Sequence, residues 1–222
     1  VLFRSRLYTF GCSFTNYRWS TWADCLAPEF DYFENWGQSG AGNEFIFNSV
    51  MEADQRREFN SGDTVIVCWT TATREDRYID GRWHTLGNMY TCPIYNKDYL
   101  TNHVDEQGLL IKTLAYIKSV KILLEHRKVQ WKFLSMDSLD SLNIYQDVVN
   151  SILPSYREVL FEKGWPDRNG DPHPSPQEHL AYLDAVLPGW VTKQSTRVIM
   201  REESTNLNKN PNKSGMSKVQ RL

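Results

Sequence analysis

Two separated stretches of the sequence carry residue types that could perform nucleophilic catalysis. Near the N-terminus, "LYTFGCSFT" places Ser13 two residues after the glycine that ends a short apolar run. Far along the chain, "GDPHPSP" contains Asp171 and His173. A serine hydroxyl is a poor nucleophile near neutral pH, so it needs a base within hydrogen-bond reach and a third group that fixes that base. His173 and Asp171 supply those types, while a turn serine and a rigid loop are the simpler alternative for each stretch alone.

The elements around these stretches must bring them together. Apolar runs of strand type alternate with helical periodicity. Strands are expected at 7–10, 32–35, 61–71 and 129–136. Helices are expected at 22–26, from about 43 onward, at 106–126, between 144 and 163 with a bend or break at Pro154, and at 176–187. This alternation predicts an α/β protein, a three-layer α/β/α sandwich with a central parallel sheet. Reactive groups gather at the carboxyl ends of such strands, which is where both stretches are expected.

The residues after the strands resemble those of the SGNH (GDSL-type) hydrolases, a superfamily of serine esterases and lipases. Gly11 and Ser13 stand where the first family block has its glycine and nucleophile, and Asp171 and His173 stand before the last helix. The resemblance covers residues 7 to 187 and implies a flavodoxin-like sheet. It implies that Ser13 attacks, His173 transfers the proton and Asp171 orients the imidazole, without a metal or an organic cofactor.

The second family block supplies an oxyanion donor, and the chain keeps its spacing. Asn35 and Gly40 lie five residues apart, as the Asn and the glycine of that block do. The resemblance therefore implies an oxyanion hole formed by the N–H groups of Ser13 and Gly40.

Three departures from the family pattern affect these expectations. Cys12 replaces the aspartate of the first block, and the last block is shortened to Asp-x-His, which leaves Asp167 as an alternative partner for His173. The Gly-x-Asn-Asp block, whose Asn donates to the oxyanion, is absent, and "WTTATRED" stands in its place. Thr71 could donate a hydroxyl and Arg74 could bind substrate there. A solvated strand end and a charged surface turn are the alternatives.

Residues 74–104 interrupt the alternation of strands and helices. This stretch is rich in Tyr, Gly, Asn and Arg and shows no sustained period, so we expect a long irregular insertion of the kind that forms functional loops or lids. Trp83 is a candidate for contact with substrate, although a small aromatic cluster under the loop fits as well. The domain is expected over 1–200, followed by a polar tail at 201–222 that a protein partner would order.

Composition narrows the classes of function. With a net charge of −2 and no basic excess, nucleic-acid binding is not expected. The chain has no apolar run long enough for a membrane span and no signal peptide, so a cytoplasmic or virion-associated protein is expected. Four cysteines without a C-x-x-C pair predict buried thiols rather than a zinc site or disulfides: Cys12, Cys25, Cys68 and Cys92.

Two functional hypotheses follow. The first is a serine esterase that removes a short acyl group, such as acetyl, from a carbohydrate or small molecule. The second is a binding or structural protein, for example a phage virion component, in which the fold persists and hydrolysis is weak or lost. The separation of the Ser13 hydroxyl and the His173 ring discriminates between them.

Overall fold

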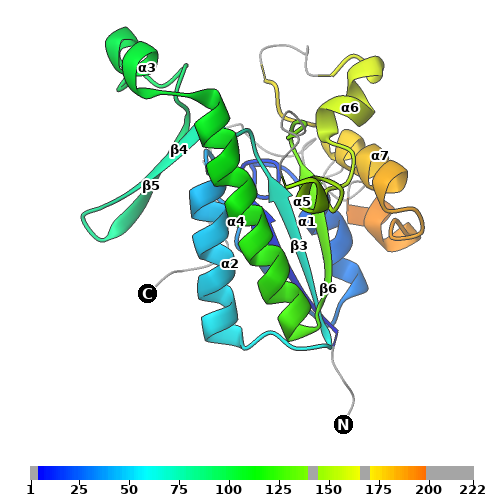
Figure 1. Ribbon diagram of the computed structural model, residues 1–222. Coiled ribbons are helices and arrows are strands. Elements are labelled where there is room, and N and C mark those ends of the chain that lie inside the picture. Colours follow the sequence, from blue (N-terminus) through cyan, green and yellow to red (C-terminus); the bar gives the residue numbers. More distant parts are fainter. Residues whose placement is uncertain (1–4, 140–144, 166–170, 199–222) are drawn as a thin grey trace.

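The fold is built on a four-stranded parallel sheet. The computed structural model describes residues 5–139, 145–165 and 171–198, and Figure 1 shows their arrangement. The strands are β1 (Arg6–Gly11), β2 (Tyr32–Asn35), β3 (Asp63–Trp69) and β6 (Gln130–Ser135). They lie in the order β2-β1-β3-β6, with Gly11 beside Cys68 and Trp69 beside Ser135. All four predicted strands are present and parallel.

Helices cover both faces of the sheet. On one face α2 (Asn43–Arg57) packs against α4 (Glu106–Arg127), and on the other α7 (Pro176–Val186) contacts α1 (Trp22–Leu26) and α6 (Tyr156–Leu160) (Figure 1). The short elements are η1 (Ala27–Glu29), α5 (Gln146–Val149) and η2 (Phe161–Lys163). The predicted three-layer sandwich is confirmed. The predicted break at Pro154 is also confirmed, because α5 and α6 lie on either side of it.

The buried pattern of each element follows its sequence. Every residue of β3 is buried, as expected for a strand covered on both faces. In α4 the buried side chains recur at helical spacing and face α2 and the sheet, and the Asp105 side chain caps the first turn by accepting from the Gly108 N–H. The apolar spacing in the sequence therefore fixes which face of this helix meets the core.

The stretch 74–104 is not irregular, and this expectation is wrong. It forms an antiparallel hairpin of β4 (Arg74–Ile79) and β5 (Arg82–Asn88), followed by α3 (Lys97–His103). Asp80 and Gly81 connect the strands with positive φ angles of 52° and 74°. Asp-Gly is a strong signal for such two-residue turns, because both central residues must adopt left-handed backbone angles. The hairpin projects from the side of the molecule beside α2 (Figure 1).

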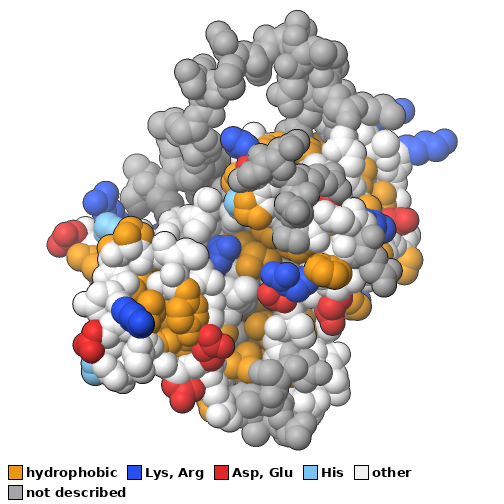
Figure 2. All heavy atoms as spheres, turned by 90° about the horizontal axis from the view of Figure 1, so that it is seen from above, with side chains coloured by type: hydrophobic (Ala, Val, Ile, Leu, Met, Phe, Trp, Pro, Cys, Tyr) orange, Lys and Arg blue, Asp and Glu red, His pale blue; other side chains and the backbone are white. Residues whose placement is uncertain are grey.

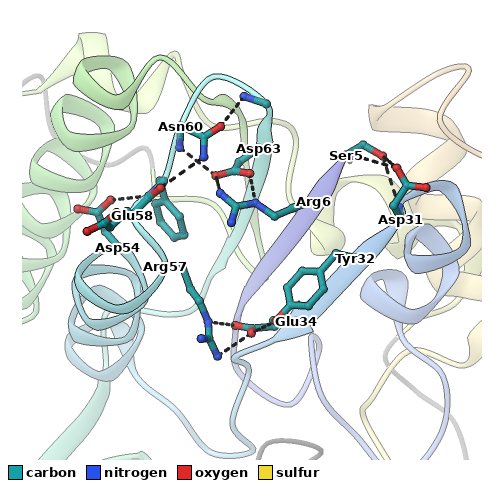
Figure 3. A network of polar contacts seen from close by, with 12 residues as sticks. Ser5, Arg6, Asp31, Tyr32, Glu34, Asp54, Arg57, Glu58, Asn60 and Asp63 are labelled. Carbon is teal, nitrogen blue, oxygen red and sulfur yellow. Dashed lines mark hydrogen bonds and ion pairs between the residues drawn. The ribbon is translucent and has the colours of Figure 1, made fainter. Parts of the chain in front are cut away.

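A network of ion pairs and hydrogen bonds fixes the amino edge of the sheet (Figure 3). The Arg6 guanidinium donates to both carboxylate oxygens of Asp63, at 2.5 and 2.6 Å, which joins β1 to β3. The Asp63 side chain is only 1% exposed, so the ion pair neutralises a buried charge. Arg57 of α2 pairs with Glu34 of β2 at 2.8 Å. The Arg6–Asp63 pair joins the first residues of β1 and β3, at the edge opposite the carboxyl ends of the strands.

The cysteines are free thiols. Cys12, Cys25 and Cys68 are buried, which confirms the prediction for these three, and Cys92 is half-buried. Burial raises the pKa of Cys68 well above its usual value, and the neighbouring Cys12 adds to this effect. Cys68 therefore stays a neutral thiol.

The remaining expectations concern a membrane span, the C-terminal tail and Asp167. Within the described ranges, no helix combines the length and apolar character that crossing a membrane requires. The predicted tail at 201–222 and the alternative partner Asp167 lie outside the described residues.

Candidate active site

The topology places one point of the sheet edge in position to bind ligands. From β1 the chain goes to β2 on one side, and it then crosses back to β3 on the other side of β1. Open α/β sheets bind ligands at the carboxyl ends of the strands where such a reversal occurs. Figure 2 looks down on this edge and shows charged side chains of both signs among hydrophobic ones.

Ser13 lies in a tight turn directly after β1. The N–H groups of Thr15 and Asn16 both donate to the Cys12 carbonyl oxygen, at 2.9 and 3.1 Å, and this turn folds the chain back over the strand end. Gly11 permits the turn, because a Cβ there would lie 2.1 Å from the Thr15 hydroxyl oxygen. The turn therefore holds Ser13 at the edge of the sheet, with 3% of the residue exposed.

His173 connects Ser13 to Asp171. Its Nε2 lies 2.8 Å from the Ser13 Oγ, and its Nδ1 lies 2.7 Å from the Asp171 Oδ1. The His173 backbone N–H donates to the same Oδ1 at 3.0 Å. The shortened Asp-x-His spacing thus still lets the carboxylate reach the ring. The Asp171 side chain folds back towards His173, so that one oxygen meets both the backbone N–H and the ring Nδ1 of that residue.

Two side chains that sequence analysis missed hold the second oxygen of Asp171. The Tyr17 hydroxyl and the Arg18 guanidinium donate to Oδ2, at 3.0 and 2.6 Å. Burial alone would raise the pKa of Asp171, but the hydrogen bonds from His173 and Tyr17 outweigh it and lower that pKa below its usual value. Asp171 is therefore a carboxylate at neutral pH, with its charge directed at the His173 ring.

Aromatic rings hold the imidazole on two sides. The Tyr17 ring stacks on His173 with a centroid distance of 4.0 Å and an interplanar angle of 16°. The Phe14 ring meets the same imidazole edge-on at 5.8 Å. Packing of this kind restricts the ring to the orientation in which each nitrogen has its partner.

Gly40 lies in a loop that is tied to the Ser13 turn. The Asn35 carboxamide donates to the Thr15 carbonyl at 2.8 Å and accepts from the Gly37 N–H at 2.9 Å. Gly40 has a φ of 79°. In the part of the chain that the structure describes, neither the Ser13 N–H nor the Gly40 N–H donates a hydrogen bond to a protein group. Both donors are thus available to a ligand.

The exit of β3, where the family has its third block, is held by a different residue. Asn43 at the start of α2 accepts from the Thr70 N–H and donates to the Thr70 carbonyl, both at 2.9 Å. Thr71, the predicted oxyanion donor, accepts a hydrogen bond from the Thr73 hydroxyl at 3.4 Å. No hydrogen bond between described residues joins Thr71 to Ser13.

Arg74 lies closer to the predicted oxyanion hole. Its Nη1 donates to the carbonyl of Ala41 at 3.2 Å, one residue after Gly40, and its Nη2 lies 3.7 Å from the Met136 sulfur at the end of β6. Its Nε is buried and makes no hydrogen bond among the described residues. The guanidinium therefore crosses the carboxyl end of the sheet near the Gly40 loop.

The structure does not bring Trp83 into contact with Ser13, His173 or Asp171. Its ring meets Phe45 of α2 at 5.9 Å and Tyr78 of β4 at 5.4 Å. These contacts fit the alternative of a small aromatic cluster that fastens the hairpin to α2.

His179, the other histidine near the site, has a structural role. It is buried, and its Nδ1 lies 2.8 Å from the Tyr156 hydroxyl. Burial, with a smaller effect of the nearby His173, lowers the pKa of His179 to about 3. His179 is thus neutral at physiological pH and supports the packing beneath Phe14, whose ring meets it edge-on.

Comparison with known proteins finds relatives in structure only. No family model and no curated protein matches the chain. The chain resembles G-D-S-L lipolytic proteins. One is from Veillonella parvula DSM 2008, with a TM-score of 0.46 and 13% identity over 82% of this chain and 96% of that one. A putative lipolytic protein of the G-D-S-L family from Desulfitobacterium hafniense DCB-2 has a TM-score of 0.46 and 14% identity over 87% and 98%.

A third similar structure is the psychrotrophic esterase EstA from Pseudoalteromonas sp., inhibited by monoethylphosphonate. Its TM-score is 0.39, with 10% identity over 90% of this chain and 98% of that one. At these identities and TM-scores the likeness assigns no residue a role, and the function of this chain is inferred from the geometry of its own site.

Proposed function

We propose that the chain is a serine esterase of the SGNH (GDSL) type. The observation that supports this most is the continuous chain of hydrogen bonds from the Ser13 Oγ through both nitrogens of His173 to the Asp171 carboxylate, at 2.8 and 2.7 Å. A nucleophile, a base and an orienting carboxylate in this order constitute the machinery of acyl transfer.

Acylation uses His173 first as a base and then as an acid. As the Ser13 Oγ bonds to the carbonyl carbon of the ester, the hydroxyl proton passes to the His173 Nε2. Asp171 stabilises the resulting imidazolium through the bond to Nδ1. When the carbon–oxygen bond of the leaving group breaks, that proton passes to the departing alkoxide, and an alcohol and an acyl-serine remain.

Deacylation repeats the sequence with water. His173 takes a proton from the attacking water, and the tetrahedral intermediate then collapses to release the carboxylic acid and return the proton to Ser13. In both stages the negative charge on the former carbonyl oxygen is stabilised by the N–H groups of Ser13 and Gly40. The Arg74 guanidinium hydrogen bonds to the Gly40 loop at the Ala41 carbonyl, and we assign it to substrate binding at this side.

We extend the proposal to a short acyl ester, such as the acetyl ester of a carbohydrate. What supports a sugar is the rim of the site, where Trp19 is half-buried and Arg18 lies 4.7 Å above its ring. The indole N–H donates to the Pro174 carbonyl, one residue from His173. A sugar ring has an apolar face and a set of hydroxyl groups. The Trp19 ring and the Arg18 guanidinium beside His173 match these two kinds of surface.

Ester turnover by matched variants tests the proposal. We expect the wild type to hydrolyse p-nitrophenyl acetate faster than p-nitrophenyl octanoate, and to release acetate from an acetylated sugar. Ser13→Ala should abolish turnover without changing the melting temperature, because a small side chain at a strand end buries little surface. Ser119→Ala is the matched control, since Ser119 is exposed on α4 and bonds only its own helix, at the Ala115 carbonyl.

Two results would contradict the proposal. Equal turnover by Ser13→Ala and the wild type would remove the role of Ser13. A wild type that is inert towards every ester would leave the alternative, a hydrolase fold retained for binding.

A further inference from the structure

The hairpin of β4 and β5 holds every residue of the loop that carries Gly40. The connection from β2 to α2 is residues 36–42; this loop is its segment 38–42, and each residue of the segment hydrogen bonds to the hairpin. The contacts are Gln38 Nε2 to Thr85 Oγ1 (3.1 Å), Thr85 Oγ1 to the Ser39 carbonyl (2.9 Å), Gly87 N–H to the Gly40 carbonyl (3.1 Å), Arg74 Nη1 to the Ala41 carbonyl (3.2 Å) and Gly42 N–H to Asp76 Oδ1 (2.8 Å).

One of these contacts fixes the direction of the Gly40 N–H. The Ser39 carbonyl and the Gly40 N–H belong to the same peptide group, and in a trans peptide these two groups point in opposite directions. Thr85 donates its hydroxyl to that carbonyl from the side of the hairpin. The Gly40 N–H therefore points away from the hairpin, and Thr85 determines its orientation.

The close approach of the two backbones prevents the loop from relaxing. A Cβ on Gly40 would lie 2.7 Å from the Thr85 backbone oxygen, and the φ of 79° favours glycine at this position. The hairpin thus packs directly on the peptide that carries the donor, with no side chain between them.

Both ends of the loop are anchored as well. The Gln38 N–H donates to the Gly11 carbonyl at the end of β1, at 3.0 Å. At the other end the buried Asp76 carboxylate accepts from the N–H groups of Gly42 and Phe45, both at 2.8 Å. The loop is therefore held between the Ser13 turn and the hairpin.

We propose that the hairpin is a positioning element of the oxyanion hole and that Thr85 is its principal positioning residue. Its hydroxyl fixes the Ser39–Gly40 peptide so that the Gly40 N–H can receive the charge that develops on the substrate carbonyl oxygen. This inference rests on the proposed function, because an oxyanion donor matters only if Ser13 attacks an acyl group.

Thr85→Val tests the proposal, because it keeps the shape of the side chain and removes the hydroxyl. Complete loss of one oxyanion donor lowers kcat by about 10² to 10³, so a donor that is present but poorly oriented should cost about 10- to 100-fold. The KM for p-nitrophenyl acetate should stay within about two-fold of the wild type, because the contact is used mainly in the transition state. Thr85→Ser should restore turnover to near the wild-type value.

Thr91→Val is the matched control, since the exposed Thr91 hydroxyl bonds only the Asn88 carbonyl and does not contact the loop. Wild-type kcat in Thr85→Val would overturn the proposal, as would a raised KM with unchanged kcat or an equal loss in Thr85→Ser. A wild type that neither hydrolyses esters nor reacts with a fluorophosphonate would instead overturn the proposed function. Wild-type activity that is abolished in Ser13→Ala, falls about 10- to 100-fold in Thr85→Val and is retained in Thr85→Ser and Thr91→Val supports both.

Discussion

Replacing Asp171 by Asn tests how the carboxylate acts on His173. The amide has the shape of the carboxylate but only one acceptor oxygen. At the Oδ1 position two donors converge, the backbone N–H and the ring Nδ1 of His173. At the Oδ2 position the donors are Tyr17 and Arg18, and the Arg18 side chain is 59% exposed. The amide oxygen should therefore stay on the side of His173, because the backbone N–H cannot move and Arg18 can turn into water.

This orientation gives the magnitude. The Nδ1–H keeps an acceptor, so His173 keeps the tautomer whose Nε2 accepts the Ser13 proton. What is lost is the negative charge beside the imidazolium. A hydrogen bond to a charged group contributes about 1 to 2 kcal/mol more than a neutral one, which corresponds to about a 5- to 30-fold lower kcat. Asp171→Ala removes the acceptor as well, and the loss should approach about 10⁴.

The assay is kcat for p-nitrophenyl acetate in both variants, with melting temperatures to confirm folding. Asp184→Asn on the exposed face of α7 is the matched control and should behave as the wild type. If Asp171→Asn is as inactive as Asp171→Ala, the backbone N–H does not fix the amide and the reasoning is wrong. Wild-type kcat in Asp171→Ala would exclude any role of the carboxylate.

Three further predictions concern stability and packing. Arg6→Ala leaves the buried Asp63 unpaired and should lower the free energy of unfolding in urea by about 3 kcal/mol with kcat unchanged; a loss below about 1 kcal/mol would contradict the ion pair's role. Burial raises the pKa of Asp76 from 3.8 to about 6, so the folded protein holds this proton more tightly than the unfolded chain does. The resulting stabilisation is fully present below about pH 4 and is lost as the pH rises through about 6. Relative to Asp76→Asn, wild-type stability should fall by about 3 kcal/mol over this window, and parallel pH profiles would refute it. Tyr17→Phe keeps the ring stacked on His173 and should lower kcat less than Tyr17→Ala; equal losses would show that the stacking contributes nothing.

Much of the fold could be predicted because its signals are local. The unbroken apolar run of β3 and the spacing of buried residues in α4 identify these elements without knowledge of their neighbours. The order of elements then places Ser13 and His173 at one edge of the sheet, since Ser13 follows a strand and His173 lies in the loop before the last helix, from which it can fold back over the same edge. That juxtaposition was predictable although 160 residues separate the two side chains.

The hairpin was missed for a physical reason. Alternation identifies a strand when one face is buried in the core, but most of β4 and β5 is exposed or half-buried. Asp80 and Gly81 carried a turn signal that the lack of apolar alternation concealed. The loop contacts of Thr85 were equally hidden, because they depend on where the hairpin packs.

The partners of Asp171 could not be predicted either. Tyr17 and Arg18 lie 154 and 153 residues away in sequence, and nothing in "TNYRWS" distinguishes them from other surface residues. The prediction of Thr71 as a donor remains a prediction. It rested on the place of Thr71 after β3, where the family has its third block, whereas Asn43 from the helix that precedes β3 holds that strand end.

Covalent labelling by a fluorophosphonate, followed by mass mapping of the labelled peptide, tests the central claim most directly. The account predicts one adduct per chain, on Ser13, that forms far more slowly in His173→Ala than in the wild type. His126→Ala, which changes an exposed histidine of α4, should be labelled at the wild-type rate. An intact wild-type protein that takes up no label, or takes it up equally in Ser13→Ala, would contradict the account.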